Sequence, residues 1–261
     1  MSSSPKARPL LEVKDLAQHF GGLKAVDQVN LTIHEGEIVS VIGPNGAGKT
    51  TFFNVLTGVY QGTRGEILFD GERVRGLPSH EIVARGMART FQNIRLFQDM
   101  TALENVMVGR HTRTSQLLLG PLLRTSAFFE EEKATEARAK ELLEFVGLKS
   151  LVNERARNLA YGAQRKLEIA RALASEPKLL ILDEPTAGMN PTESVDLVKL
   201  VRKVRERGVT VLLIEHQMRV VMDISDRVFV FDYGVKIAEG APKDVVANPR
   251  VVEAYLGKEG A

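Results

Sequence analysis

The sequence predicts an α/β fold in which helices cover a mainly parallel sheet, with antiparallel strands before it and a helical segment inserted into it. Three observations lead to this fold class. Strand-like runs separated by turn residues fill the N-terminal part, charged helical periodicity dominates the middle, and helices alternate with apolar strands in the last third. At 261 residues, 44% of them hydrophobic, the chain is long enough for one large domain with an inserted subdomain.

The N-terminal part is expected to form an antiparallel β subdomain and the first strand of the core. The expected strands are residues 10–13, 26–33, 38–42 and 66–69, which glycine-containing turns separate. Residues 1–9 are polar and are expected to be a flexible tail without the apolar core of a signal peptide. A single domain is therefore expected to cover residues 10–261.

The middle of the chain is expected to be a helical subdomain, inserted at about residues 93–170. Within it, residues 130–145 show a helical spacing of apolar residues among charges, and Gly147 is suited to end that helix. Residues 112–129 contain leucines on both sides of Gly120-Pro121 and are expected to be a surface excursion, whose form the sequence leaves open.

The last third of the chain alternates between helices and strands, which is typical of a parallel sheet covered by helices. Helices are expected at residues 164–174 and 192–207, and strands at residues 178–182, 209–214, 227–231 and 235–238, with short helices up to residue 256.

Composition excludes several kinds of site and partner. The formal net charge is only +2, so charge does not imply a nucleic-acid partner. The chain has no cysteine, which excludes disulfides and cysteine-ligated metals and fits a reducing cytoplasm. No run of ~18 or more apolar residues is present, so no transmembrane helix is expected.

A glycine-rich run fits the phosphate-loop pattern of Gly, four residues, and Gly-Lys-Ser/Thr. The run is Gly43-Pro44-Asn45-Gly46-Ala47-Gly48-Lys49-Thr50. Its flanks, an apolar strand before and a helix after, favour a P-loop NTPase core over a plain glycine turn. Backbone N–H groups of such a loop and the helix N-terminus bind phosphate. Lys49 would then reach the β- and γ-phosphates, and the Thr50 hydroxyl would bind Mg2+.

Two carboxylates follow the run Leu179-Leu180-Ile181-Leu182, whose continuous apolar character is typical of a central parallel strand. The carboxyl ends of such strands are where open α/β sheets bind ligands. Asp183 is therefore expected to hold Mg2+, and Glu184 to accept a proton from the attacking water. The alternative is an ordinary strand followed by an Asp-Glu-Pro turn.

Three further side chains are candidates whose alternatives remain open. Gln92 follows a short strand-like run and either offers its amide to the metal and water or is a surface amide. His216 ends an apolar strand, where a neutral imidazole would hydrogen-bond a γ-phosphate or only cap the strand. Phe20 precedes Gly21-Gly22 and either stacks on adenine or belongs to the core.

The order of these residues resembles the nucleotide-binding subunits of ATP-binding-cassette (ABC) transporters over nearly the whole chain. Leu159-Ala160-Tyr161-Gly162 stands where that family has its signature, which completes the ATP site of a second subunit. The resemblance implies that ATP and Mg2+ are the cofactors, and that phosphate loop and signature both contact the nucleotide.

The resemblance also implies roles for single residues. Phe20 would stack on adenine, and Thr51 would join the phosphate shell. Gln92 would sense the metal and the attacking water, Glu184 would be the general base, and His216 would contact the γ-phosphate.

The finer match is to the ATPase subunits of branched-chain amino-acid importers, and among them to the longer of the two that such importers usually contain. It rests on RTFQNIRLF at residues 89–97, LAYG at 159–162, LIEH at 213–216 and NPRVVEAYLG at 248–257. The implied partners are a second ATPase subunit, membrane-spanning permease subunits and, indirectly, a periplasmic or extracellular binding protein. The implied location is the cytoplasmic face of the inner membrane.

Four residues depart from the pattern of that family. Ala160 replaces the usual signature serine, and Ala163 replaces the glutamine that the subfamily commonly keeps. Asn190 replaces an aspartate in the loop after the base, and Gln217 replaces the aspartate that commonly follows the histidine. Because the signature lacks a hydroxyl and an amide, the second ATPase subunit is expected to be non-identical.

Other functions are compatible with parts of this pattern. Urea or amide import and lipopolysaccharide export would keep the chemistry and change the cargo. A soluble ABC ATPase of translation or DNA repair would usually carry two cassettes or a long coiled coil, whereas this chain has one phosphate loop and no heptad run. A module that binds nucleotide without hydrolysis would not need Glu184.

Overall fold

The computed structural model describes residues 8–113 and 126–256. Most of the expected tail and most of the expected excursion at residues 112–129 therefore lie outside the described residues. Within the described part the predicted α/β fold is confirmed, because a mainly parallel sheet lies beside an antiparallel one.

The larger sheet has six strands in the order β10, β9, β3, β8, β7, β6. Their bounds are β3 Ile38–Ile42, β6 Met87–Arg89, β7 Leu179–Asp183, β8 Thr210–Ile214, β9 Arg227–Asp232 and β10 Val235–Gly240. All neighbours are parallel except β9 and β10, which pair antiparallel. Asp183 of β7 is in register with Ile214 of β8, so the loops after both strands leave the same edge of the sheet.

The smaller sheet is antiparallel, in the order β2, β1, β4, β5. Its strands are β1 Pro9–Phe20, β2 Leu23–His34, β4 Arg64–Phe69 and β5 Glu72–Arg73. The strands β1 and β2 are longer than predicted, because shifts in their register let the pairing continue past polar residues. Asp15, with a φ of 48°, lies at one of these shifts.

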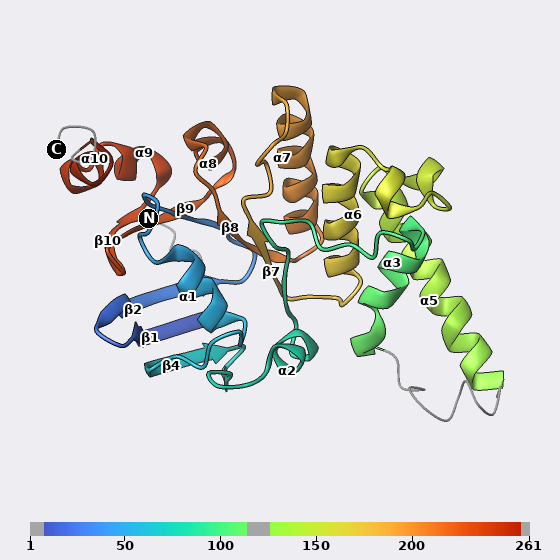
Figure 1. The fold of residues 1–261 in the computed structure, drawn as a ribbon, viewed down its shortest axis with the longest axis horizontal. Helices are drawn as coiled ribbons and strands as arrows, with labels where there is room; N and C mark the ends of the chain where they lie inside the picture. Colours follow the sequence, from blue (N-terminus) through green and yellow to red (C-terminus); the bar gives the residue numbers. More distant parts are fainter. Residues whose placement is uncertain (1–7, 114–125, 257–261) are drawn as a thin grey trace, which may run out of the picture.

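Helices cover the larger sheet and form a separate group at one end. They are α1 Lys49–Leu56, α2 Ser79–Ala84, α3 Ala102–Gly109, α5 Ser126–Phe145, α6 Tyr161–Leu173, α7 Pro191–Glu206, α8 Met218–Ile224, α9 Pro242–Val246 and α10 Pro249–Leu256. Figure 1 shows α3, α5 and α6 together at the end of the molecule opposite the smaller sheet. No helix within residues 8–113 and 126–256 has the length and apolar character needed to cross a membrane.

The central strand β7 lies between two hydrophobic cores. Leu179 and Ile181 belong to the core shared with the smaller sheet and α1. Leu180 and Leu182 belong to the core formed with α5, α6 and α7. The strand is buried on both faces, which is why its sequence is continuously apolar instead of alternating.

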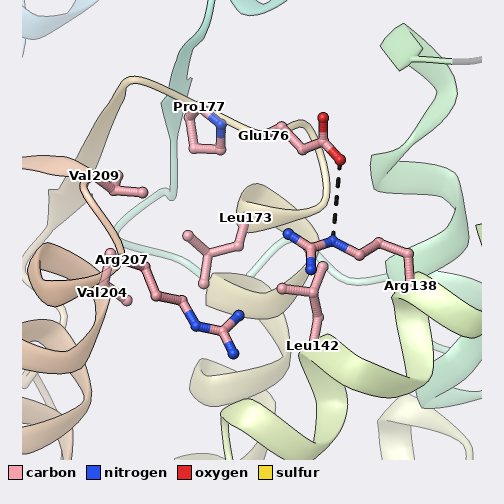
Figure 2. Close-up of a pocket in the computed structure, with 8 residues that line it drawn as sticks. All are labelled: Arg138, Leu142, Leu173, Glu176, Pro177, Val204, Arg207 and Val209. Atoms are coloured by element: carbon pink, nitrogen blue, oxygen red, sulfur yellow. Dashed lines mark ion pairs between the residues drawn. The ribbon is translucent and has the colours of Figure 1, made fainter.

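The join between the helical group and the larger sheet is incompletely filled. A cavity of about 190 Å3 lies there, with Leu142 and Leu173 on its apolar wall (Figure 2). Arg138 of α5 points toward Glu176, with its Nε 4.0 Å from the Oε1 of that residue. Arg207, at the end of α7, lines the cavity from the opposite side. Long charged side chains therefore bridge this part of the join, where close apolar packing is missing.

A buried ion pair on α6 holds the segment that follows β6. Arg165 Nη1 and Glu168 Oε2 are 2.8 Å apart, and both side chains are at most 1% exposed. Arg165 also donates to the carbonyl oxygens of Phe91 and Gln92, at 2.7 and 2.8 Å. Glu168 Oε1 accepts the N–H groups of Phe91 and Arg95, at 3.3 and 3.4 Å. The backbone around Gln92 is therefore held by α6.

Substitution E168Q tests the energetic weight of this pair. Burial raises the pKa of Glu168, although Arg165 and the two N–H groups lower it. Removing this carboxylate from water therefore costs free energy. Glutamine would leave the buried Arg165 cation without its counter-charge, and we expect the free energy of unfolding in urea to fall by about 3 kcal/mol.

The matched control is D99N, which removes an exposed pair between Asp99 and Arg157. Exposed pairs contribute under about 1 kcal/mol. An E168Q protein as stable as D99N would contradict the structural role of the buried pair.

Candidate functional site

The phosphate loop connects β3 to α1, as the sequence predicts. Gly43 and Gly48 have φ angles of 151° and 93°. A Cβ atom on Gly43 would lie 2.2 Å from the carbonyl oxygen of Phe231, and one on Gly48 would lie 2.2 Å from that of Ala25. Because both neighbours are backbone atoms, neither position accommodates a side chain. The loop is thus packed backbone to backbone against β2 and β9.

Lys49 opens α1, and its ammonium group curls back toward the loop. The Nζ atom donates to the carbonyl oxygens of Gly43 at 2.6 Å and of Pro44 at 2.9 Å. The N-cap of α1 is Gly48, and no side chain caps the first N–H groups of this helix. An anion in the loop would meet these N–H groups and the Lys49 charge together.

The loop forms one wall of an open hollow of about 440 Å3, a volume typical of small-molecule sites. The lining residues are Asn45, Gly46, Ala47, Gly48, Lys49, Thr50 and Thr51 of the loop and α1, together with Leu23, Lys24, Ala25, Gln92, Glu184, Ile214, Tyr233 and Gly234. Gln92 and Glu184, which the sequence selected separately, therefore face the same space as the phosphate loop.

Three polar side chains selected from the sequence meet at the edge of this hollow. Gln92 Nε2 donates to Glu184 Oε2 at 2.9 Å, and His216 Nδ1 lies 3.7 Å from the same oxygen. Glu184 has a φ of 44°, which is uncommon for a residue with a side chain. Its N–H donates to the carbonyl oxygen of Ile214 at 3.0 Å. Strained backbone of this kind clusters at functional sites, where the surrounding structure holds it in place.

Glu215, which the sequence analysis did not single out, joins the loops that carry Glu184 and His216. Its side chain is fully buried, and Oε2 accepts the N–H groups of His216 and Gln217 at 2.9 and 3.1 Å. Its Oε1 accepts the hydroxyl and the N–H of Thr186. One buried carboxylate therefore ties the loop after β7 to the loop after β8. The sequence does contain a signal for Glu215, because this charged residue directly follows the apolar run of β8.

Asp183 is engaged by an arginine that the sequence analysis did not assign to it. Its Oδ2 accepts a hydrogen bond from Arg89 Nη2 at 2.7 Å, and both side chains are buried. Arg89 also donates to Asn54 Oδ1 at 2.8 Å and to Thr57 Oγ1 at 3.2 Å, both in or next to α1. This network ties β6 and β7 to the helix that follows the phosphate loop.

The oxygen donors around the hollow suit a magnesium ion. Thr50, Gln92 and Glu184 line the hollow, and Asp183 directly precedes Glu184. Within the described residues, no three acidic or histidine side chains form a metal cage. Mg2+ is usually held by one or two carboxylates together with phosphates and waters, so this sparse donor set fits it.

Phe20 lies at the end of β1 as a surface ring, so the alternative that it belongs to the core is wrong. It is 44% exposed, and its ring packs edge to face on Tyr60 with the centroids 5.4 Å apart. Among the described residues, Leu23 and Tyr233 line the hollow and Phe20 does not. The exposed ring keeps a face that can accept a stacked base.

The signature residues lie at the start of α6, which begins earlier than the predicted residue 164. Ala160 is the N-cap and supplies no side-chain hydrogen bond. Tyr161 Oη accepts from Arg165 Nη2 at 3.2 Å, and a Cβ on Gly188 would lie 3.3 Å from the tyrosine ring. Gly162 is buried. No signature residue is among those that line the hollow of this chain.

Two further departures from the family pattern, like Ala160, stand at helix N-caps. Asn190 is the N-cap of α7, where Oδ1 accepts the N–H of Glu193 at 2.9 Å and Glu193 Oε2 accepts the N–H of Asn190 at 3.0 Å. Asparagine and aspartate cap helices equally well, so this exchange keeps the local structure. Gln217 is the N-cap of α8 without a side-chain capping hydrogen bond.

A second groove, of about 230 Å3, lies between β6 and the helices α3 and α6. Phe97 and Val108 line it and are 47% and 41% exposed, and the Arg171 guanidinium lies 5.8 Å from the centre of the Phe97 ring. Glu168 also lines this groove. The groove and the Gln92 segment therefore rest on the same buried ion pair.

Comparison with known proteins yields two family matches and a near full-length relative. The ABC transporter family matches residues 26–187, and the branched-chain amino acid ATP-binding cassette transporter family matches residues 235–261. The high-affinity branched-chain amino acid transport ATP-binding protein BraF of Pseudomonas aeruginosa is 51% identical over 253 residues, which cover 97% of this chain and 99% of BraF.

Solved structures of ATP-binding cassettes have the same fold. The ADP conformation of MJ1267, an ATP-binding cassette of an ABC transporter, superposes with a TM-score of 0.84 at 33% identity and covers 96% of this chain and all of its own. The dimeric post-hydrolysis state of the cassette MJ0796, bound to ADP and Pi, has a TM-score of 0.74 at 27% identity, with 89% and 98% covered.

Proposed function

The chain belongs to the ABC transporter ATP-binding family, and we propose that it is the ATP-hydrolysing subunit of an importer for branched-chain or related amino acids. One observation carries the ATPase chemistry: Glu184, hydrogen-bonded to Gln92 at 2.9 Å, faces the same hollow as the phosphate loop. The cargo is inferred from the similarity to BraF and from the family match at residues 235–261.

ATP binds with its phosphates in the loop, where the N–H groups at the start of α1 and the Lys49 ammonium compensate their charge. Lys49 exchanges its bonds to the Gly43 and Pro44 carbonyl oxygens for the β- and γ-phosphates. The Thr51 hydroxyl joins the phosphate shell, and Phe20 offers a stacking face to adenine.

Thr50, Gln92 and Asp183 are the residues that would hold Mg2+, which neutralises charge on the phosphates when bound. Arg89 donates to one oxygen of Asp183, so a metal would have to bind the other carboxylate oxygen.

Glu184 serves as the general base of hydrolysis. Its carboxylate takes a proton from water as the water oxygen attacks the γ-phosphorus, and the bond to the bridging oxygen breaks to release ADP. Gln92 orients this carboxylate and the water, and His216 hydrogen-bonds a γ-phosphate oxygen. Glu215 holds the His216 backbone, so the two catalytic loops keep their spacing during the step.

A second ATPase subunit completes the site. The hollow of this chain contains loop and base but no signature residue, so the signature at this site comes from a partner cassette. The signature of this chain completes the partner's site instead. There it offers helix N–H groups but no side chain from Ala160, and the Tyr161 hydroxyl is held by Arg165.

The groove around Phe97 is the docking site for a membrane-spanning permease subunit. An exposed aromatic ring beside a cation suits a short helix with apolar and acidic residues. Such docking places this chain at the cytoplasmic face of the membrane as a peripheral subunit. It also couples the permease to Gln92, because Glu168 contacts both the groove and the Gln92 segment.

Substitution E184Q should leave ATP binding nearly unchanged and slow turnover by ~10²–10⁴-fold, since it removes the base and keeps the shape. Steady-state phosphate release and filter binding of ATP by the assembled transporter measure the two effects. ATP-bound dimers should accumulate in the variant. Hydrolysis at the wild-type rate would remove Glu184 from this role.

Substitution F97A should lower amino-acid uptake into vesicles several-fold more than it lowers basal ATPase activity, because it removes the exposed ring of the groove. Leu96 packs against the core instead, so L96A mixes docking with stability. The matched control is F129A, which truncates an exposed ring on α5 and should leave uptake unchanged. Equal loss of transport and basal activity in a folded F97A protein would count against docking.

The purified chain should be mostly monomeric and slow, and a second, non-identical ATPase subunit should raise its turnover. A side-chain hydrogen bond to a charged group contributes roughly 1.5–3 kcal/mol of binding free energy. The signature of this chain lacks such a bond, so the ATP site that it completes on the partner should be the weaker of the two. E184Q in this chain should therefore reduce the activity of the pair more than the matching change in the partner. Sedimentation and ATPase assays of the mixture test this, and a fully active, cooperative homodimer would contradict it.

A further inference from the structure

The two ends of a bound nucleotide meet different parts of the hollow. Residues 45–51 line it where the phosphates bind, and Gln92 and Glu184 line it where the γ-phosphate reacts. Ile214 lies on that reactive side, because it pairs in register with Asp183. The lining residues that remain belong to the start of β2 and to the turn between β9 and β10, and they are Leu23, Lys24, Ala25, Tyr233 and Gly234. This part of the hollow is therefore left for the nucleoside.

The turn between β9 and β10 is fixed directly to the phosphate loop. The N–H of Gly234 donates to the carbonyl oxygen of Ala47 at 3.0 Å, and the carbonyl oxygen of Gly234 accepts the N–H of Asp27 at 2.8 Å. A Cβ atom on Gly234 would lie 2.9 Å from the carbonyl oxygen of Ala25, so the turn also packs closely on β2. Tyr233 is consequently held at a fixed place relative to the loop.

Tyr233 has a backbone conformation that a tyrosine rarely adopts. Asp232 and Val235 pair in register, so the turn has two central residues, Tyr233 and Gly234, with φ angles of 44° and 81°. Two-residue turns in which both φ angles are positive favour asparagine or aspartate at the first position. The ring is 74% exposed and so adds little to the hydrophobic core. Strained backbone of this kind clusters at functional sites.

The Tyr233 ring faces the part of the hollow that is left for the nucleoside. Among the described residues that line the hollow, it is the one aromatic side chain. Leu23 lines the same space, is 66% exposed and pairs in register with Phe20 across the turn between β1 and β2. Nucleobases pack on aromatic faces, and apolar side chains exclude water from such a contact. Two neighbouring turns thus offer apolar surface beside the phosphate loop.

We propose that Tyr233 contacts the nucleoside part of the bound nucleotide through its ring. This contact adds to the stacking face of Phe20 and comes from a different turn. It raises the affinity for ATP and ADP above that for their phosphate groups alone, and it gives the strained turn a function. The inference rests on the proposed binding of the phosphates at the loop.

Substitution Y233N removes the ring and places at this position a residue that such a turn favours. The dissociation constant of the full chain for Mg-ADP, measured by calorimetry, should rise about three- to tenfold, the range of one aromatic contact. The constant for magnesium pyrophosphate should stay within about twofold of wild type, because pyrophosphate has no nucleoside. Without ligand, Y233N should unfold at the wild-type temperature or above it. Y233F keeps the ring and should bind both ligands as wild type does.

The matched control is V235A, which truncates a 39% exposed side chain next to the turn that does not line the hollow. It should bind both ligands as wild type does. Y233N protein that binds Mg-ADP as tightly as wild type would overturn the proposal. Equal weakening of Mg-ADP and pyrophosphate would also overturn it, since Tyr233 would then act on the phosphate loop. Failure of the proposed function itself would look different, because the wild type would then bind Mg-ADP no better than K49A.

Discussion

The buried ion pair of Arg165 and Glu168 is the contact on which the arrangement of the site depends. Two charges removed from water are stable only when they are paired and further hydrogen-bonded. Here the further partners are backbone groups of Phe91, Gln92 and Arg95, so α6 holds the Gln92 segment in place. Arg165 also holds Tyr161 at the start of the same helix. The side chain that meets Glu184 and the signature residues at the start of α6 are therefore parts of one connection, and a movement of α6 displaces both.

The phosphate loop depends on a different constraint, the close approach of backbones. Gly43 and Gly48 lie against carbonyl groups of β9 and β2, where a Cβ atom does not fit. The loop is consequently supported by two parts of the chain, the antiparallel sheet and the last parallel strand. This support explains how a loop built largely of glycine and small residues keeps one conformation, although glycine favours none by itself.

The structure divides the proposed catalytic cycle between two surfaces. The phosphate loop, Glu184 and Gln92 line one hollow, and none of the signature residues 159–162 lines it. The groove around Phe97 is lined in part by Glu168, whose carboxylate also accepts N–H groups of the Gln92 segment. In the proposed function, a force applied by a partner in that groove would reach Gln92 through the backbone that Glu168 holds. At the join of α5, α6 and α7, a cavity of about 190 Å3 remains between the helical group and the sheet.

The sequence by itself determined the fold class, the phosphate loop, the buried strand before Asp183 and Glu184, and the family. Each of these is a local pattern, in which the chemistry is carried by residue types at short, defined spacings. It did not determine where β1 and β2 end or where α6 begins, because bulges and packing override local propensity. Only the tertiary structure decided that Glu215 joins two loops, that Arg89 pairs with Asp183 and that Tyr161 turns to Arg165. The physical reason is that most of these contacts join residues far apart along the chain or choose one among several possible partners. Their geometry exists only once the sheet has brought the strand ends together.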